Sequence, residues 1–168
     1  MCGSVDEGII MEDIIYKYLT WNDIELACLN IYDQMVKNKY KPDCIIGLSR
    51  GGVIPGRLFS DYFDVVEYFF SLDVKMYTGI KKTMEEAIIR PFHEEIKGKC
   101  LVVDDIWDSG MTMRAVLEYL KGKDITTATL YWNGKVKDRP DYYCHETKCY
   151  EWISFPWEKF ETDRMKTQ

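Results

Sequence analysis

Apolar residues along the chain follow two kinds of spacing, one typical of helices and one typical of strands. Over residues 23–39 they recur at every third or fourth position, which predicts an amphipathic helix whose apolar face is made by Ile24, Ala27, Cys28, Ile31 and Met35. Thr20 and Asn22 precede these positions, and either side chain can cap the first turn. Further helices are expected over residues 53–62 and 111–120.

Short runs of β-branched, aromatic and other apolar residues indicate strands. These runs are residues 44–48, 65–70, 74–77, 87–92, 100–104, 126–132, 142–149 and 151–155. Strands that alternate with helices are typical of an α/β fold with a mostly parallel central sheet flanked by helices. Ligands of such sheets bind beyond the carboxyl ends of the strands. We therefore expect residues 49–52, 104–112 and 133–137 to converge there.

The composition is typical of one globular domain, so we expect residues 1–168 to form a single domain with residues 1–10 as a loose tail. Charged residues make up 30% of the chain and apolar residues 46%. The net charge of −6 argues against general nucleic-acid binding, which requires clustered positive charge. No apolar run approaches the ~20 residues of a membrane span, and residues 1–8 do not resemble a signal peptide. These features predict a cytoplasmic protein.

The six cysteines favour reduced thiols over a disulfide framework or a zinc site. Cys28, Cys44 and Cys100 lie in apolar segments, where a thiol behaves as a small hydrophobic group. The zinc alternative would use Cys144, His145 and Cys149, but structural zinc usually takes four ligands in paired spacing.

Residues 101–113 contain the strongest indication of chemistry. An apolar run ends in Asp104 and Asp105, and a short turn with the hydroxyls of Ser109 and Thr112 then leads into the expected helix. Backbone N–H groups at a helix start and neighbouring hydroxyls can bind a phosphate, and the two carboxylates can accept hydrogen bonds from a diol. The segment therefore suits a ribose 5-phosphate. The alternatives are a solvated acidic turn after an ordinary strand and a nucleotide triphosphate loop, but no Gly-Lys-Ser/Thr follows a glycine-rich turn.

This segment resembles the thirteen-residue 5-phosphoribosyl 1-diphosphate (PRPP) signature of the type I phosphoribosyltransferases. The resemblance implies the fold of that family, a mostly parallel sheet flanked by helices and completed by a small hood. It implies that Asp104 and Asp105 hold the ribose hydroxyls of PRPP, directly or through Mg²⁺. It also implies that Asp108 acts as the general base toward N7 of a purine. The 5′-phosphate is expected at the backbone and hydroxyl groups of Asp108, Ser109, Gly110, Met111 and Thr112.

A second segment resembles the pyrophosphate loop of the same family, in the form found in xanthine-guanine and archaeal purine enzymes. It consists of Ser49, Arg50, Gly51 and Gly52. The planar guanidinium of Arg50 can make paired hydrogen bonds to diphosphate oxygens. The family often has a cis peptide before this basic residue, so the same is implied between Ser49 and Arg50. The alternative is a plain strand-to-helix turn.

The span 77–95 lies where this family has a mobile lid that closes over PRPP. Lys81, Lys82 and Arg90 are the cations in this span that are candidates for contact with the diphosphate. The alternative is a charged, solvated hairpin, and the sequence does not separate the two.

Residues 151–158 resemble the segment that closes the base site of xanthine-guanine and archaeal enzymes, with the pattern Trp-Ile-x-x-Pro-Trp-acidic. The resemblance implies that Trp152 stacks on the base and that the backbone at Ile153 meets its polar edge. The alternative for both tryptophans of this hood segment is ordinary packing. Members that bind 6-oxopurines usually have a lysine directly after the strand expected at 126–132. This chain has Asn133 there, with Lys135 two positions later. An asparagine amide can donate to an oxo group or accept from an amino group.

The resemblance implies purine salvage. A 6-oxopurine (hypoxanthine, guanine or xanthine) and PRPP would give a nucleoside 5′-monophosphate and diphosphate, with Mg²⁺ held in part by Asp104 and Asp105. It also implies a homodimer or a higher homo-oligomer. Two alternatives stay open: a PRPP-binding regulatory protein without transferase activity, and a phosphoribosyltransferase for another base.

Overall fold

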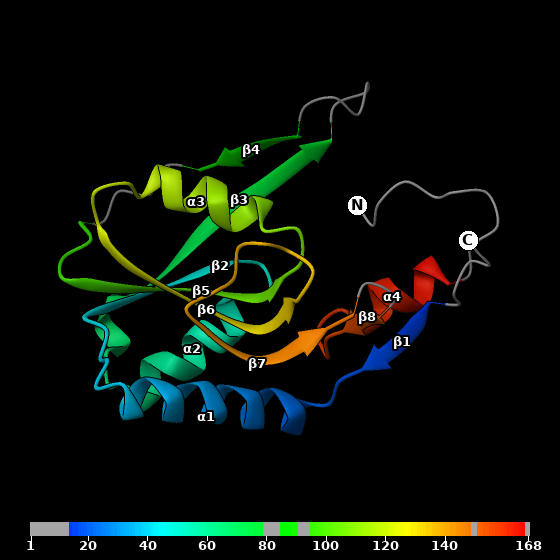
Figure 1. Ribbon diagram of the computed structural model, residues 1–168, viewed down its shortest axis with the longest axis horizontal. Helices are drawn as coiled ribbons and strands as arrows, with labels where there is room; N and C mark the ends of the chain where they lie inside the picture. The colour runs from blue at the N-terminus through cyan, green and yellow to red at the C-terminus, as the bar shows by residue number, and fades with distance from the viewer. Residues whose placement is uncertain (1–13, 79–84, 91–94, 149–150, 167–168) are drawn as a thin grey trace.

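The computed structural model describes residues 14–78, 85–90, 95–148 and 151–166. A six-stranded sheet with the order β4-β3-β2-β5-β6-β7 forms its centre (Figure 1). The strands are β2 Cys44–Ser49, β3 Phe69–Thr78, β4 Glu85–Ile89, β5 Lys99–Trp107, β6 Asp124–Asn133 and β7 Tyr142–Thr147. All neighbouring pairs run parallel except β3 with β4, which is antiparallel. The predicted α/β fold with a mostly parallel sheet is therefore confirmed.

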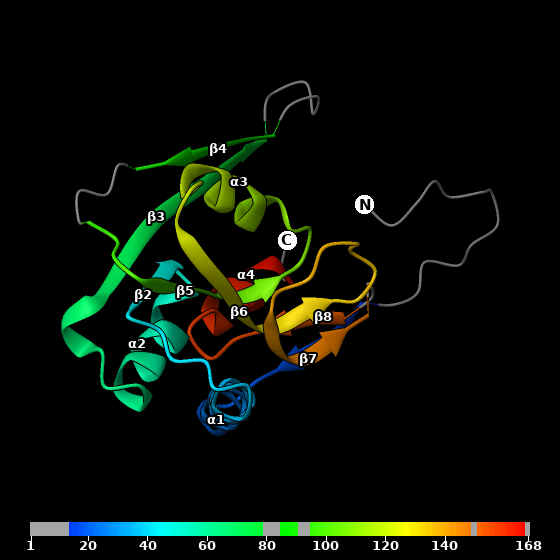
Figure 2. The ribbon, with the colours of Figure 1, turned by 60° about the vertical axis from the view of Figure 1, so that its left-hand side comes forward.

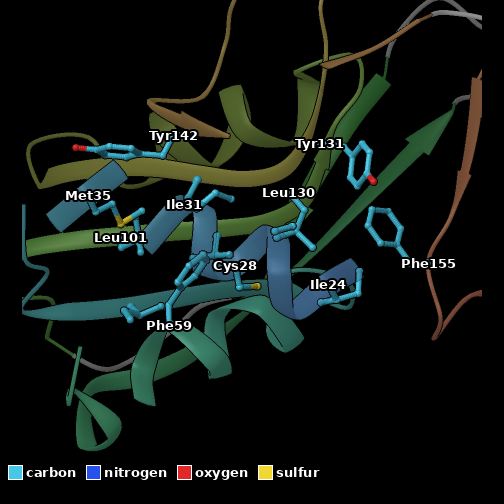
Figure 3. Close-up of a cluster of buried hydrophobic side chains, with 14 of the residues drawn as sticks. Ile24, Cys28, Ile31, Met35, Phe59, Leu101, Leu130, Tyr131, Tyr142 and Phe155 are labelled. Atoms are coloured by element: carbon cyan, nitrogen blue, oxygen red, sulfur yellow. The ribbon is translucent and has the colours of Figure 1, made fainter. Parts of the chain in front are cut away.

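Helices cover both faces of this sheet. On one face lie α1, Trp21–Lys37, and α2, Val53–Tyr62, and on the other lies α3, Met111–Tyr119 (Figure 1). Figure 3 shows Ile31 and Met35 of α1 gathered against Leu101 and Leu130 of the sheet, and all four side chains are fully buried. Burial of each such aliphatic side chain contributes about 1.5–3 kcal/mol to stability.

The helix predicted over residues 23–39 is α1, and its buried face contains all five predicted apolar residues. The cap is Thr20 rather than Asn22. The Thr20 hydroxyl oxygen accepts a hydrogen bond from the backbone N–H of Asp23, and the Asp23 carboxylate accepts one from the backbone N–H of Thr20. This reciprocal box satisfies two N–H groups, so the helix begins at Trp21, two residues earlier than expected.

A second, smaller sheet pairs the two ends of the described chain. Strand β1, Ile15–Tyr18, runs parallel to β8, Glu151–Ser154, and the short helix α4, Lys159–Met165, follows. The hydroxyl of Tyr18 donates to Asp163 of α4 at 2.8 Å. Figures 1 and 2 show β1, β8 and α4 grouped beyond the carboxyl ends of β5 and β6, which is the position of the predicted hood. Neither β1 nor α4 was predicted as an element.

The strand prediction for residues 65–70 was wrong in part. Val66–Tyr68 form a short 3₁₀ helix whose Val66 and Tyr68 side chains are 50% and 57% exposed. Residues 74–77 belong to the same strand as residues 69 and 70, because β3 runs without a break. The β propensity of residues 66–68 is overridden because their side chains are exposed, whereas Val65 packs against the core. Strand β4 ends at Ile89 and β7 ends at Thr147. The last residues of these two predicted strands, 91–92 and 149, lie outside the described residues.

Within the described ranges, the helices are all too short or too polar to cross a membrane.

Candidate active site

The parallel order of the sheet brings two predicted segments together. Strands β2 and β5 are neighbours, so the turns that follow them lie side by side. We call residues 49–52 the glycine loop and residues 108–112 the phosphate turn. Strand β6 lies on the other side of β5, so the residues after Asn133 adjoin the phosphate turn. The convergence that the sequence predicted is therefore present.

The phosphate turn borders a pocket of about 320 Å³, which extends back along β5 to Asp104 and Asp105. Gly110 has φ 75°, a left-handed conformation that favours glycine, and α3 begins directly after it. Ser109 Oγ accepts from the backbone N–H of Met111 at 3.4 Å. The N-cap residue of α3 is Gly110, which has no side chain to accept hydrogen bonds. N–H groups of the first turn of α3 therefore stay available to an anion.

Arg114 anchors the phosphate turn, although the sequence analysis did not single it out. Its guanidinium donates to the carbonyl oxygen of Ser109 at 2.9 Å and pairs with Asp138 at 2.8 Å. It thereby joins α3, the turn and the segment after β6. The only sequence signal is an arginine one helical turn after a glycine.

Asp104 and Asp105 lie near the carboxyl end of β5, where Asp104 is half-buried and Asp105 is buried. Burial raises the pKa of Asp104 well above its ordinary value, and the neighbouring charge of Asp105 adds to this effect. Burial likewise raises the pKa of Asp105 to about 6. Hydrogen bonds, such as the one that the backbone N–H of Ile106 donates at 2.8 Å, act in the opposite direction and lower this pKa. Two such carboxylates are stabilised by a bound cation or by donors such as ribose hydroxyls.

The two carboxylates also fit Mg²⁺. Among the described residues, no cluster of three or more His, Cys, Asp or Glu side chains is placed to hold a metal. Mg²⁺ typically takes one or two carboxylates and completes its shell with water and substrate phosphates, so Asp104 and Asp105 suffice on the protein side.

The glycine loop approaches β5 so closely that side chains are excluded. A Cβ added to Gly51 would overlap the carboxylate of Asp105, and one added to Gly52 would overlap the carbonyl oxygen of Val103. The peptide bond between Ser49 and Arg50 is cis, as the family resemblance implied.

A second pocket, of about 360 Å³, lies between the glycine loop and the hood. It is lined by Arg50, Gly51, Ile54, Asp105, Trp157, Glu158 and Glu161. Asp105 borders this pocket and the first one, so the two adjoin. Arg50 is largely exposed, and its guanidinium pairs with Glu161 of α4 at 3.2 Å.

The hood contributes two acidic residues that were not predicted as site residues. Burial raises the pKa of Glu158 to about 7, and the charges of Asp105 and Glu161 act in the same direction. Glu158 was visible in the sequence as the acidic end of the hood motif. Glu161 had no signal, because only the fold of α4 brings it to Arg50.

Asp108 and Asn133 are joined directly. The side-chain amide of Asn133 donates from Nδ2 to Oδ1 of Asp108 at 3.0 Å. Its Oδ1 accepts from the backbone N–H of Lys135 at 3.2 Å. The predicted general base and the residue expected at the base edge are therefore in contact.

The predicted base-stacking residue is placed apart from the two pockets. Trp152 is 42% exposed, and the centre of its ring system lies 6.5 Å from the ring of Tyr16 on β1. Neither of the two pockets described above includes it, so its stacking role stays a prediction. Ile153 is buried in the core, and Trp157 stacks on Phe155 with ring systems 5.0 Å apart.

The cations of the predicted lid are only partly described. Lys81 and Lys82 lie outside the described residues. Arg90 follows β4 and pairs with Asp73 of β3 at 3.1 Å. Cys149 of the zinc alternative also lies outside the described residues, whereas Cys144 is a free thiol on β7.

Comparison with known proteins is consistent with this geometry. The family described as "Phosphoribosyl transferase domain" matches residues 16–161. A xanthine-guanine phosphoribosyltransferase of Gluconobacter oxydans is 27% identical over 149 residues, which cover 88% of this chain and 87% of that protein. A crystal structure of a purine phosphoribosyltransferase from Pyrococcus horikoshii is 34% identical, with a TM-score of 0.70 over 84% of this chain and 93% of its own. A Helicobacter pylori xanthine-guanine-hypoxanthine phosphoribosyltransferase, at 20% identity, shares the fold with a TM-score of 0.72 over 91% of this chain and 99% of its own.

Proposed function

This chain belongs to the phosphoribosyltransferase family, and from that premise we propose that it transfers the 5-phosphoribosyl group of PRPP to a 6-oxopurine. The observation that carries the proposal is the position of Asp105, whose carboxylate borders both the pocket of the phosphate turn and the pocket beside Arg50. PRPP has a phosphate at C5, a diol, and a diphosphate at C1. That order of groups matches the order of turn, carboxylates and glycine loop. The names of the relatives from Gluconobacter and Pyrococcus support a purine as the acceptor.

In the proposed reaction, each group of the site acts on one part of the substrates. The phosphate turn binds the 5′-phosphate, Asp104 and Asp105 hold the ribose hydroxyls, and the glycine loop with Arg50 binds the diphosphate. The bond between C1 and the diphosphate oxygen breaks while N9 of the purine bonds to C1. The proton on N7 passes to Asp108. Holding these groups in position and stabilising the departing diphosphate supply much of the rate.

Asp104 and Asp105 would hold Mg²⁺ together with PRPP oxygens. When bound, the ion would neutralise charge on the diphosphate and on the two buried carboxylates. A cytoplasmic location, a homo-oligomer and a lid over residues 77–95 also stay predictions.

The test measures diphosphate release from PRPP and Mg²⁺ with hypoxanthine, guanine, xanthine or adenine supplied separately, beside a reaction without base. We expect release that depends on a 6-oxopurine. PRPP binding by calorimetry without release for any base would favour the regulatory alternative. Release with a different kind of base alone would favour a transferase of other specificity.

A variant tests the role of Asp108. Asp108→Asn should lower kcat about 10²- to 10⁴-fold, the usual contribution of a general base, while the Kd for PRPP changes little. Asp33→Asn, on the exposed side of α1, is the matched control. Equal losses in kcat and in PRPP affinity would contradict a base role and indicate a binding role instead.

A further inference from the structure

The peptide that joins Ser109 to Gly110 has two available orientations. Gly110 has φ 75° and ψ −1°, the values of the third residue of a type II turn. In a type I turn the same residue has φ of about −90°, and the peptide before it faces the opposite way. Because glycine adopts either φ at little cost, the residue type alone does not decide between the two orientations.

This orientation determines which backbone group an anion meets. The N–H and C=O of a trans peptide point in opposite directions. Ser109 and Gly110 border the pocket of the phosphate turn, whereas Arg114, which holds the carbonyl oxygen of Ser109, does not. The Gly110 N–H therefore points away from Arg114 and toward the pocket, and among the described residues no group accepts a hydrogen bond from it. In the reversed orientation the Ser109 carbonyl oxygen would face the pocket and repel an anion.

The guanidinium of Arg114 is itself held in place. It donates to the carbonyl oxygen of Ser109 at 2.9 Å and pairs with the carboxylate of Asp138 at 2.8 Å. The backbone carbonyl oxygen of Asp138 accepts in turn from the indole N–H of Trp132 on β6 at 3.1 Å. A Cβ added to Gly110 would lie 2.8 Å from Nη1 of Arg114, so the guanidinium packs directly against the turn. Arg114 thus joins the peptide of the turn to the sheet.

We propose that Arg114 is a positioning residue, which holds the Ser109 carbonyl oxygen and thereby selects the peptide orientation that presents the Gly110 N–H to the 5′-phosphate of PRPP. The inference rests on the proposed function. Arg114 acts from behind the turn and does not touch the phosphate. Without its hydrogen bond the reversed orientation competes, and the affinity for a phosphate falls with the population of the competent turn.

Loss of Arg114 also removes a positive charge near an anion, so the variants must separate charge from orientation. Arg114→Met removes both the charge and the hydrogen bond to Ser109. Asp138→Asn keeps that bond and removes a negative charge. The double variant Arg114→Met/Asp138→Asn lacks the bond but has the net charge of the parent protein. Arg57→Met breaks an ion pair with Asp61 on α2 that is about as exposed as the pair of Arg114, and is the control.

The first measurement is the calorimetric Kd for PRPP and for inorganic diphosphate, each with Mg²⁺, because diphosphate lacks the 5′-phosphate. Arg114→Met and the double variant should bind PRPP about 10- to 100-fold more weakly, the range for loss of a hydrogen bond to a charged group. Their affinity for diphosphate should stay unchanged. Asp138→Asn should bind PRPP at least as tightly as the parent, and Arg57→Met should match the parent for both ligands. Thermal melting shows that each variant is folded.

The second measurement needs no variant. In the ¹⁵N-labelled parent protein, PRPP should move the amide proton signal of Gly110 downfield, because this N–H then donates to a phosphate oxygen. Inorganic diphosphate should leave the signal in place. A Gly110 signal that does not move when PRPP binds would overturn the inference.

Two further results would overturn the inference while leaving the proposed function standing. A double variant that binds PRPP like the parent would assign the effect of Arg114 to its charge. Equal losses of PRPP and diphosphate affinity in Arg114→Met would assign it to the general stability of the site. A parent protein that neither binds PRPP nor releases diphosphate with any base would instead reject the proposed function, and the inference with it.

Discussion

At the scale of single residues, Asp105 links the parts of the site. The residue is 7% exposed and borders both pockets, and its carboxylate lies against Gly51. A charged group in this position is less stable than one in water unless a ligand compensates. The free protein is therefore expected to be less stable when Asp105 is ionised, and substrate with Mg²⁺ is expected to restore that stability.

This cost predicts a pH dependence. The pKa of Asp105 is about 6 in the folded protein against an ordinary value of 3.8, so the folded state binds the proton more tightly. The contribution of this group to the free energy of unfolding should fall as pH rises from about 4 to about 6 and stay lower above. At 1.36 kcal/mol per pKa unit, the free energy of unfolding of Asp105→Asn should rise by about 2–3 kcal/mol relative to that of the parent as pH rises from about 4 to about 6.

Urea denaturation without PRPP or Mg²⁺, from about pH 4.5 to 7.5, measures this difference. Asp33→Asn, which removes an exposed carboxylate on α1, is the control. A difference between Asp105→Asn and the parent that does not change with pH would show that Asp105 is solvated in the free protein.

At the scale of elements, α4 controls the surroundings of the glycine loop. It places Glu161 against the guanidinium of Arg50 at 3.2 Å, where the diphosphate is expected. Glu161→Gln should remove this competitor and one negative charge from the pocket. Because exposed ion pairs contribute about 0–1 kcal/mol, the expected gain in PRPP affinity is about two- to fivefold with little change in stability.

Calorimetric titration with PRPP and Mg²⁺ measures the effect of Glu161→Gln. Glu118→Gln, on α3, removes an exposed ion pair with Lys121, which follows that helix, and is the control. Weaker PRPP binding by Glu161→Gln would show that the ion pair holds Arg50 in its binding position rather than competing for it.

At the scale of the whole molecule, the hood and the sheet share one core. Phe155 follows β8, is 1% exposed, and lies against Tyr131 of β6 with ring centres 5.9 Å apart (Figure 3). Phe155→Ala should lower the free energy of unfolding by about 3–5 kcal/mol, the usual cost of removing a buried aromatic ring. Because the ring joins two sheets, we expect one cooperative transition at lower urea rather than separate loss of the hood.

In a background where Trp21, Trp107 and Trp132 are replaced by phenylalanine, the fluorescence of Trp152 and Trp157 reports on the hood, whereas far-ultraviolet circular dichroism reports on the whole chain. Urea curves followed by both probes test cooperativity. Phe160→Ala changes a ring that is 84% exposed on α4 and is the control. Two separated transitions in Phe155→Ala would mean that the hood unfolds independently.

The sequence was sufficient wherever the determining contacts are local. The spacing from Ile24 to Met35 predicted the buried face of α1, because residues three and four apart share a helix face. At Gly51 and Gly110 the residue type agrees with the structure, since each position excludes a side chain for steric or conformational reasons. These segments predicted the fold, which is confirmed, and the two turns, whose binding of phosphate stays a prediction.

Contacts between distant segments were decided by the tertiary structure alone. Arg50 meets Glu161 across 111 positions, and Asn133 meets Asp108 across 25. The sequence left Asn133 able to donate or accept, and only the placement of the Asp108 carboxylate and the Lys135 N–H orients its amide. The pairing of β1 with β8 likewise places Trp152 beside Tyr16. The physical reason is that local spacing determines which face of an element is buried, whereas strand order and chain topology determine which side chains meet across the site.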